Sequence, residues 1–274
     1  MELLTLAVDI AFGRNFYIFH DLRAAFFAFL RPTGRNITVI HAPGKRLWLT
    51  KAISFLHAFM QKQVVMVAGD IYPNPPTSRV VVLENFSTAH IKSNDASADA
   101  IYFGRMADTK NVLDLAAFWS GHMTEGTLHM LGDGALLPEL RDKYEHADSN
   151  IVFHGPIPHD QIREIANGCR FYTSFSTLEG LSLSLIEAMD GGLIPLVTDL
   201  PSQRFVQEID GVPLVMVKGD YPKLAAEIQA INALSEAARS EMRQTIHTTV
   251  QERFRDKWIA YWDSTLRSAL PRTQ

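Results

Sequence analysis

The stretch from Phe171 to Thr198 constrains the fold of this chain more than any other part of the sequence. It opens with Phe171–Ser174, a short apolar run that is typical of a buried strand. A helix capped by Ser182 or Ser184 is expected next, ending at Gly191-Gly192. A second apolar run closes the stretch, which therefore predicts a strand–loop–helix–strand unit.

Two carboxylates, Glu179 and Glu187, lie in this unit and are separated by seven residues. In an open α/β sheet, ligands bind outside the carboxyl ends of the strands, where loops and helix starts converge. Gly180 and the nearby serines allow close approach of backbone N–H groups, and a helix N-terminus favours an anion. The unit suits a phosphate beside hydroxyl groups, although the spacing alone also fits a surface helix with two solvated glutamates.

Apolar runs alternate with helical segments along the chain, which predicts an α/β protein with parallel sheets. The small, polar segment Ser93–Asp99 interrupts this alternation and marks the best domain boundary. We expect one domain over residues 1–95, a second over 96–250, and a closing aromatic helix within 251–274.

The order of residues is more specific than their spacing. In this order of residues, the chain resembles the donor site of retaining GT-B glycosyltransferases of the group 1, or family 4, type, in which the motif is written E-x7-E. The segments that carry the resemblance are Glu179-Gly180, Ile186–Met189, Gly192 and Asp199–Pro201. The resemblance covers about residues 100–218 and departs from the family at Asp190, where a small residue is usual. It implies two Rossmann-like, doubly wound parallel-sheet domains facing a cleft, the first domain being reduced and the closing helix crossing back to it.

Gly104 and Arg105 follow an expected strand, and Lys110 lies five residues after Arg105. A glycine at a strand end permits a tight turn, while arginine binds phosphate as a fork and lysine as a point charge. Alone, these cations also fit solvated surface charge. They resemble the family's donor diphosphate pair, which implies that Arg105 and Lys110 stabilise charge on the leaving diphosphate.

The resemblance also implies the remaining site residues. Glu179 is expected to hold hydroxyls of the donor sugar without acting as a covalent nucleophile, and Glu187 to accept from the ribose hydroxyls. A histidine of the first domain, His20 or His41, is expected near the acceptor, and the sequence does not choose between them. The expected donor-binding residues are Gly104, Gly132, His154, Gly180, Leu181, Ser182, Leu183, Ser184 and Glu187.

Charge is distributed unevenly along the chain. Residues 1–95 carry ten Lys/Arg and six Asp/Glu, a net charge of +4, whereas residues 96–274 carry a net charge of −8. A basic, aromatic surface can attract an anionic acceptor or a membrane face, although most of these aromatics are expected in the core.

The single cysteine, Cys169, excludes an intramolecular disulfide and fits a reducing compartment. Met1–Phe12 lacks the basic start of a signal peptide, and no apolar run is long enough to cross a bilayer. We therefore expect a cytoplasmic protein, with peripheral contact at the inner face of the membrane as a further expectation.

The sequence and the resemblance together predict a retaining glycosyltransferase that moves a sugar from a nucleotide-diphosphate sugar, a UDP-sugar first, to a glycan or lipid-linked acceptor. No cofactor and no nucleic-acid partner is expected. No obligatory metal is expected either, since the ten histidines form no metal signature. Two alternatives stay open: a non-catalytic sugar-nucleotide-binding subunit that needs a protein partner, and a GT-B sugar phosphorylase. The absence of G-x-G-x-x-G and of a Walker-type loop argues against NAD(P) enzymes and ATPases.

Overall fold

A computed structural model describes residues 17–20, 36–40, 63–66, 80–84, 86, 89–209, 215–216 and 220–269. The chain forms two compact units, one of residues 1–85 with 256–274 and the other of residues 86–255. The second unit holds all the expected donor-site residues. His41 lies outside the described residues.

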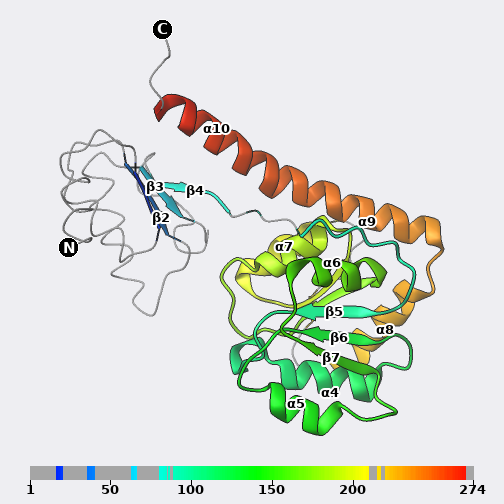
Figure 1. Cartoon of the computed structure of the whole chain (residues 1–274). Helices are drawn as coiled ribbons and strands as arrows, with labels where there is room; N and C mark the ends of the chain where they lie inside the picture. The colour runs from blue at the N-terminus through cyan, green and yellow to red at the C-terminus, as the bar shows by residue number, and fades with distance from the viewer. Residues whose placement is uncertain are drawn as a thin grey trace. The chain divides into compact units, whose positions relative to one another are not determined.

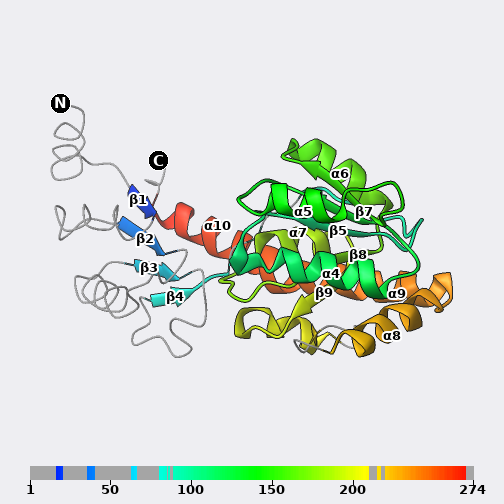
Figure 2. The same cartoon turned by 90° about the horizontal axis from the view of Figure 1, so that it is seen from below.

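The first unit contains a parallel sheet in the order β1-β2-β3-β4, seen beside its labels in Figure 2. Its strands are β1 (Tyr17–His20), β2 (Asn36–Ile40), β3 (Gln63–Met66) and β4 (Val80–Val82). Ile37 and Val39 alternate along β2 and are both buried, so one face of this strand is packed. The unit also includes α10 (Lys257–Ala269). The parallel strands predicted for this part of the chain are confirmed.

The second unit is built on a six-stranded parallel sheet in the order β10-β9-β8-β5-β6-β7. Its strands are β5 (Ala100–Phe103), β6 (Leu128–Leu131), β7 (Ile151–Gly155), β8 (Phe171–Ser174), β9 (Ile194–Thr198) and β10 (Val215–Met216). Its helical segments are η3 (Asp108–Lys110), α4 (Val112–His122), α5 (Leu137–Tyr144), α6 (His159–Gly168), α7 (Leu183–Asp190), η4 (Pro201–Glu208), α8 (Tyr221–Asn232), α9 (Glu236–Val250) and the π-helical η5 (Gln251–Asp256).

Helices cover both faces of this sheet. Helices α4 and α5 lie on one face, while α6, α7 and α9 lie on the other (Figure 1). The helices leave little of the central strands exposed to water, and all the residues of β5, β8 and β9 are buried. None of the described helices is long and apolar enough to cross a bilayer.

The strand order reverses at β5, which pairs with β6 on one side and with β8 on the other. The chain winds outward from β5 to β6 and β7, and then returns to β8 and continues to β9 and β10. At such a reversal the loops after the two central strands diverge to opposite faces and leave a crevice at their carboxyl ends. The loops that follow Phe103 and Ser174 therefore border the crevice in which a doubly wound sheet binds its ligand.

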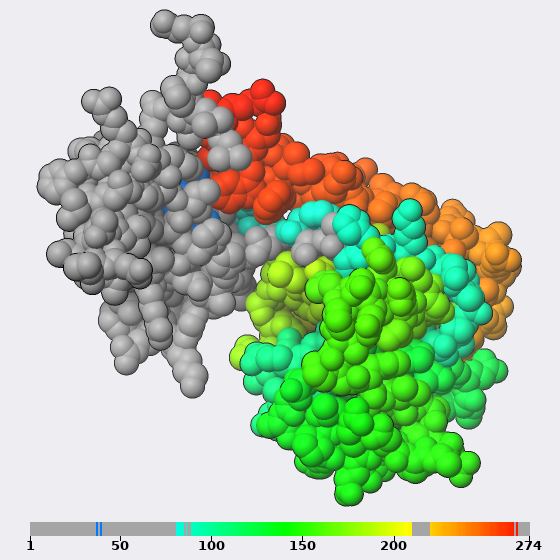
Figure 3. Space-filling model, in the orientation of Figure 1, coloured from blue at the N-terminus to red at the C-terminus, as the bar shows by residue number. Residues whose placement is uncertain are grey.

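The segment expected as the domain boundary is held tightly by the second unit, which begins at Phe86. Asp95 is buried, and its two carboxylate oxygens accept from Arg170 Nε at 2.5 Å and Arg239 Nε at 2.6 Å. In Figure 3 the cyan segment before β5 runs along the surface beside the orange α9. Although burial opposes it, pairing with Arg239 and Arg170 lowers the pKa of Asp95. The polar composition of Ser93–Asp99 therefore reflects a buried ion cluster as well as a connection.

Replacing Asp95 with alanine should destabilise the second unit by about 3–5 kcal/mol, because two buried guanidinium groups would lose their shared carboxylate. Urea denaturation measures this loss. The exposed Asp148→Ala serves as the control and should change the free energy of unfolding by less than about 0.5 kcal/mol. Equal stability of the two variants would show that the ion cluster is not a stabilising contact.

Candidate active site

The loops after β5, β6 and β7 enclose a pocket of about 400 Å³ at the carboxyl edge of the sheet. Its walls combine apolar side chains with the turns that end these strands. It is lined by Phe103, Gly104, Arg105, Leu131, Gly132, Asp133, Pro156, Ile157 and Ile162. Two of the expected donor-binding residues, Gly104 and Gly132, thus lie beside Arg105.

Lys110 and Glu179 meet at the neighbouring crevice between β5 and β8. Lys110 Nζ, at the end of η3, donates to Glu179 Oε1, and both side chains are largely buried. Ser176 Oγ donates to the same carboxylate oxygen at 2.8 Å, and Ser174 Oγ lies 3.0 Å from Ser176 Oγ. The geometry brings together two of the residues singled out in the sequence and adds the buried Ser176, which orients the carboxylate.

Hydrogen bonds to backbone oxygens fix the Glu179 loop to the neighbouring connections. Thr177 N donates to Thr109 O at 2.9 Å, which ties the loop to η3. Ser202 Oγ donates to Glu179 O at 3.0 Å, and Thr198 Oγ1 donates to Ser176 O at 2.5 Å, which ties it to the end of β9 and to η4. Three loops from separate strands thus hold one carboxylate in place.

The start of α7 settles which serine caps this helix. Ser182 Oγ accepts from Leu185 N at 3.4 Å and is the N-cap, whereas Ser184 Oγ lies 2.8 Å from the hydroxyl of Tyr172. Burial raises the pKa of Tyr172 to about 12, so the phenol keeps its proton and can either donate to or accept from Ser184. This N-terminus lies directly after Gly180 and Leu181, where its N–H groups favour an anion.

The two glutamates of the motif differ in environment. Glu179 sits in the loop and is half-buried, whereas Glu187 lies in the second turn of α7 and is only 7% exposed. Leu183, the first residue of α7, is exposed. The reading of two solvated glutamates on a surface helix does not hold, because one is off the helix and the other is buried.

Gly132 makes a close backbone crossing at the pocket. Its φ is +125°, and a Cβ at this position would lie 2.0 Å from Gly104 O. Across this crossing Gly104 N donates to Leu131 O and Met106 N donates to Asp133 O. Only glycine permits the two loops to approach in this way.

Arg105 follows this crossing as an exposed residue on the pocket wall. The Tyr102 hydroxyl donates to Arg105 O at 2.8 Å, which fixes the turn that presents the side chain. Burial raises the pKa of the Tyr102 phenol; the charge of Glu179 also raises it, and that of Arg105 lowers it. Both charges therefore lie near this one buried phenol.

Of two further histidines predicted for the site, His154 is not among the residues that line the pocket, and the side chain of His20 is not described. His154 Nε2 lies 3.0 Å from His129 Nδ1 on the adjacent strand β6, and His154 does not line the pocket. His129 Nε2 in turn lies 3.7 Å from an Asp99 carboxylate oxygen. His20 ends β1, but its side chain is outside the described part of the structure.

Sequence reasoning missed Ser176, Tyr172 and Ser202. Ser176 had a usable signal, since it is polar and directly follows the strand–loop boundary three residues before Glu179. Tyr172 lies inside an apolar strand and Ser202 lies well beyond the motif, so only the fold places them here. Within the described ranges, no three or more His, Cys, Asp or Glu residues gather closely enough to hold a metal ion.

The His129–His154 pair predicts how stability depends on pH. Burial lowers the pKa of both rings, and the proximity of His129 lowers that of His154 further. Depressed folded-state pKa values mean that the unfolded chain binds more protons, so the free energy of unfolding should fall as the pH drops below about 6.5. Urea denaturation at pH values between 7.5 and 5.5 measures the slope of the free energy of unfolding against pH. Each additional proton that the unfolded chain binds contributes up to about 1.4 kcal/mol per pH unit to this slope.

His154→Gln should flatten this slope, because one titrating ring is removed. His146→Gln, an exposed histidine on the same unit, should leave it unchanged. A slope that is identical in wild type and His154→Gln would contradict the assignment to this pair.

Comparison with known proteins places this geometry in a family. Residues 97–233, half of the chain, match the family model described as "Glycosyl transferases group 1". The GDP-mannose:cellobiosyl-diphosphopolyprenol alpha-mannosyltransferase of Xanthomonas oryzae pv. oryzae (strain PXO99A) is 20% identical over 204 residues, which cover 68% of this chain and 53% of that protein. The chain thus spans about half the length of this curated relative.

Solved structures share the fold at low identity. Sucrose-phosphate synthase from Thermosynechococcus elongatus matches with a TM-score of 0.76 at 18% identity, covering 96% of this chain and 75% of that chain. Anabaena HepE in complex with UDP and glucose matches with a TM-score of 0.73 at 13% identity, covering 97% and 82%. S. aureus TarM matches with a TM-score of 0.68 at 16% identity, covering 88% and 53%. With its parallel α/β sheets, its GT-B fold and its match over residues 97–233, the chain belongs to the group 1 glycosyl transferases.

Proposed function

We propose that this chain transfers a sugar, with retention of anomeric configuration, from a nucleotide-diphosphate sugar to a glycan or lipid-linked acceptor. The single observation that carries this proposal is the contact between Lys110 and Glu179 at the reversal of the strand order, with Arg105 on the adjoining pocket wall. A cationic group for a diphosphate and a carboxylate for sugar hydroxyls are thereby combined at one crevice.

Arg105 and Lys110 are proposed to stabilise the negative charge that develops on the leaving diphosphate. The Arg105 guanidinium binds as a planar fork, and the ammonium of Lys110 has three donors, so it can contact a phosphate while it holds Glu179. Fixed cations at the leaving group act electrostatically and require no proton transfer. The N–H groups at the start of α7, after Gly180 and Ser182, add to this charge stabilisation.

Glu179 is proposed to accept from the donor sugar. Its Oε1 accepts from Lys110 and Ser176, which leaves Oε2 for a sugar hydroxyl. A carboxylate held by a lysine and a serine is a positioned acceptor and a poor nucleophile, which favours attack on the same face as the leaving phosphate. Glu187 is proposed to accept from the ribose hydroxyls, as the family resemblance implies.

The donor is proposed to be a UDP-sugar. The pocket beside Arg105 has an apolar wall of Leu131, Ile157 and Ile162 that suits a flat base. The HepE and TarM structures that share this fold contain UDP, which supports the choice. The name of the Xanthomonas relative contains GDP-mannose, so GDP is the competing nucleotide in the test.

On the acceptor side, His20 or His41 is proposed as the histidine near the acceptor. The Xanthomonas relative is named for a diphosphopolyprenol substrate, which supports a lipid-linked acceptor. The net charge of +4 over residues 1–95 suits a cytoplasmic protein that touches the inner face of a membrane. A GtfA/B complex matches with a TM-score of 0.67 at 18% identity, which supports a protein partner.

Titration with UDP and GDP tests the donor site directly. Arg105→Ala should weaken UDP binding by about 1.5–3 kcal/mol, roughly ten- to a hundredfold, because one charge-assisted contact is lost. Arg267→Ala removes an equally charged but exposed side chain on α10 and should leave the affinity unchanged. Turnover of UDP-glucose by wild type then separates an enzyme from a binding subunit. A folded wild type that binds neither nucleotide would overturn the proposal.

A further inference from the structure

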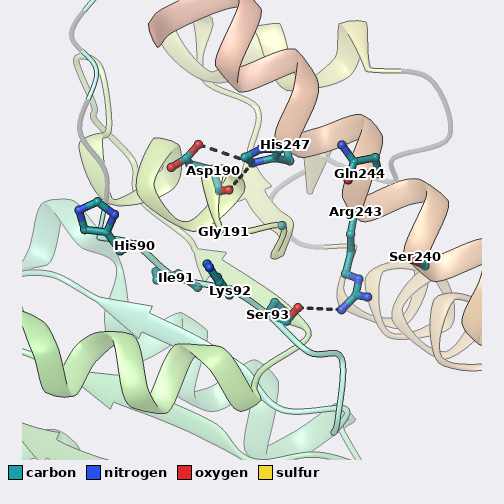
Figure 4. Close-up of a pocket in the computed structure, with 11 residues that line it drawn as sticks. His90, Ile91, Lys92, Ser93, Asp190, Gly191, Ser240, Arg243, Gln244 and His247 are labelled. Atoms are coloured by element: carbon teal, nitrogen blue, oxygen red, sulfur yellow. Dashed lines mark hydrogen bonds and ion pairs between the residues drawn. The ribbon is translucent and has the colours of Figure 1, made fainter.

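A second pocket of about 400 Å³ lies within the second unit and shares no lining residue with the first. Its walls come from the segment before β5, from the end of α7 and from α9 (Figure 4). Asp190–Gly192 directly precede β9, so this pocket is at the amino edge of the sheet. Parallel strands of four or five residues, at about 3.3 Å each, separate it from the carboxyl edge. It is therefore a different site from the proposed donor site.

One face of α9 is directed at this pocket. Ser240, Arg243, Gln244 and His247 follow the spacing of three, four and seven residues that aligns side chains along a helix. Arg243 Nη1 donates to Ser93 O at 3.1 Å, and its buried Nε has no hydrogen-bond partner among the described residues. The bond to Ser93 O holds the guanidinium at the pocket wall, and the planar fork of arginine has further N–H donors.

The charge of the pocket is positive. Lys92 is exposed, and its side chain forms no ion pair with a described residue, whereas its backbone N–H donates to Asn167 Oδ1 at 2.7 Å. Asp190 is the one carboxylate among the described lining residues. It accepts from Gln251, and the His247 ring lies 3.6 Å from its Oδ1 and 2.6 Å from its backbone oxygen. Lys92 and Arg243 carry two positive charges against the single negative charge of Asp190, so the described lining residues have an excess of positive charge.

We infer that this pocket binds the phosphate group of a small, soluble molecule, with Lys92 and Arg243 as the phosphate ligands. Lysine supplies a point charge and arginine a fork, which together match a phosphate. Ser240 and Gln244 supply neutral donors and acceptors for hydroxyl groups on the same face of α9. The volume is in the range of small-molecule sites.

Titration calorimetry of the full chain tests this site. The phosphate titrations use chains that carry Arg105→Ala, because this substitution weakens phosphate binding at the proposed donor site. Glycerol 3-phosphate should bind more tightly than inorganic phosphate, and glycerol should give no heat. Lys92→Glu should weaken phosphate binding at least tenfold, because it reverses a charge in the pocket. Lys223→Glu, an equal charge change at an exposed position on α8, should stay within twofold.

A second variant and a second readout keep the outcome clear. Gln244→Glu places a negative charge on the exposed α9 residue and should weaken phosphate binding as Lys92→Glu does. Both variants should keep the melting temperature, and in an otherwise wild-type chain both should keep the affinity for UDP, so this result is independent of the donor site. Phosphate binding that is absent, or that neither variant changes, would overturn the inference. Binding to phosphatidate vesicles without binding to glycerol 3-phosphate would overturn the soluble ligand in favour of a lipid headgroup.

Discussion

The site depends on the contacts that hold Glu179 in place. Lys110 reaches it from the connection after β5, Ser176 from the connection after β8, and Ser202 holds its backbone from the connection after β9. Each of these groups is half-buried or buried, so an unpaired partner would be costly. The network therefore orders three loops at once, and it does so at the edge of a sheet that has helices on both faces (Figure 1).

The sheet itself determines where such a network can form. Because β5 pairs with both β6 and β8, the chain leaves it in two directions and the following loops separate. Gly132 then lets the loop after β6 cross against Gly104, which shapes the wall that carries Arg105. A side chain at this crossing would push the loops apart. The position of the cation and the shape of the pocket thus follow from one backbone contact.

The two edges of the sheet carry different chemistry. The carboxyl edge pairs Lys110 with Glu179 and carries Arg105 on the adjoining pocket wall, which suits the proposed diphosphate and sugar. The amino edge gathers Lys92 and Arg243 beside an Asp190 that already has partners. Asp190 is also the residue at which the motif departs from the family. In this fold the Asp190 carboxylate accepts from Gln251, at the start of η5, and lies 3.6 Å from the His247 ring of α9, whose closer contact is with the Asp190 backbone oxygen.

The sequence by itself determined the fold class and singled out Lys110 and Glu179, which the structure brings into contact. Alternating apolar runs predicted parallel sheets, and the order of residues from Glu179 to Pro201 indicated the family, because period and turn chemistry are local properties. Only the tertiary structure decided that Ser182 caps α7 and that Ser176 orients Glu179. Only the structure placed Asp95 in a buried ion cluster and paired His154 with His129. The last two join residues that are far apart in the chain, so their partners are fixed by register and packing, whereas the first two are local contacts that depend on the loop conformation which the fold imposes.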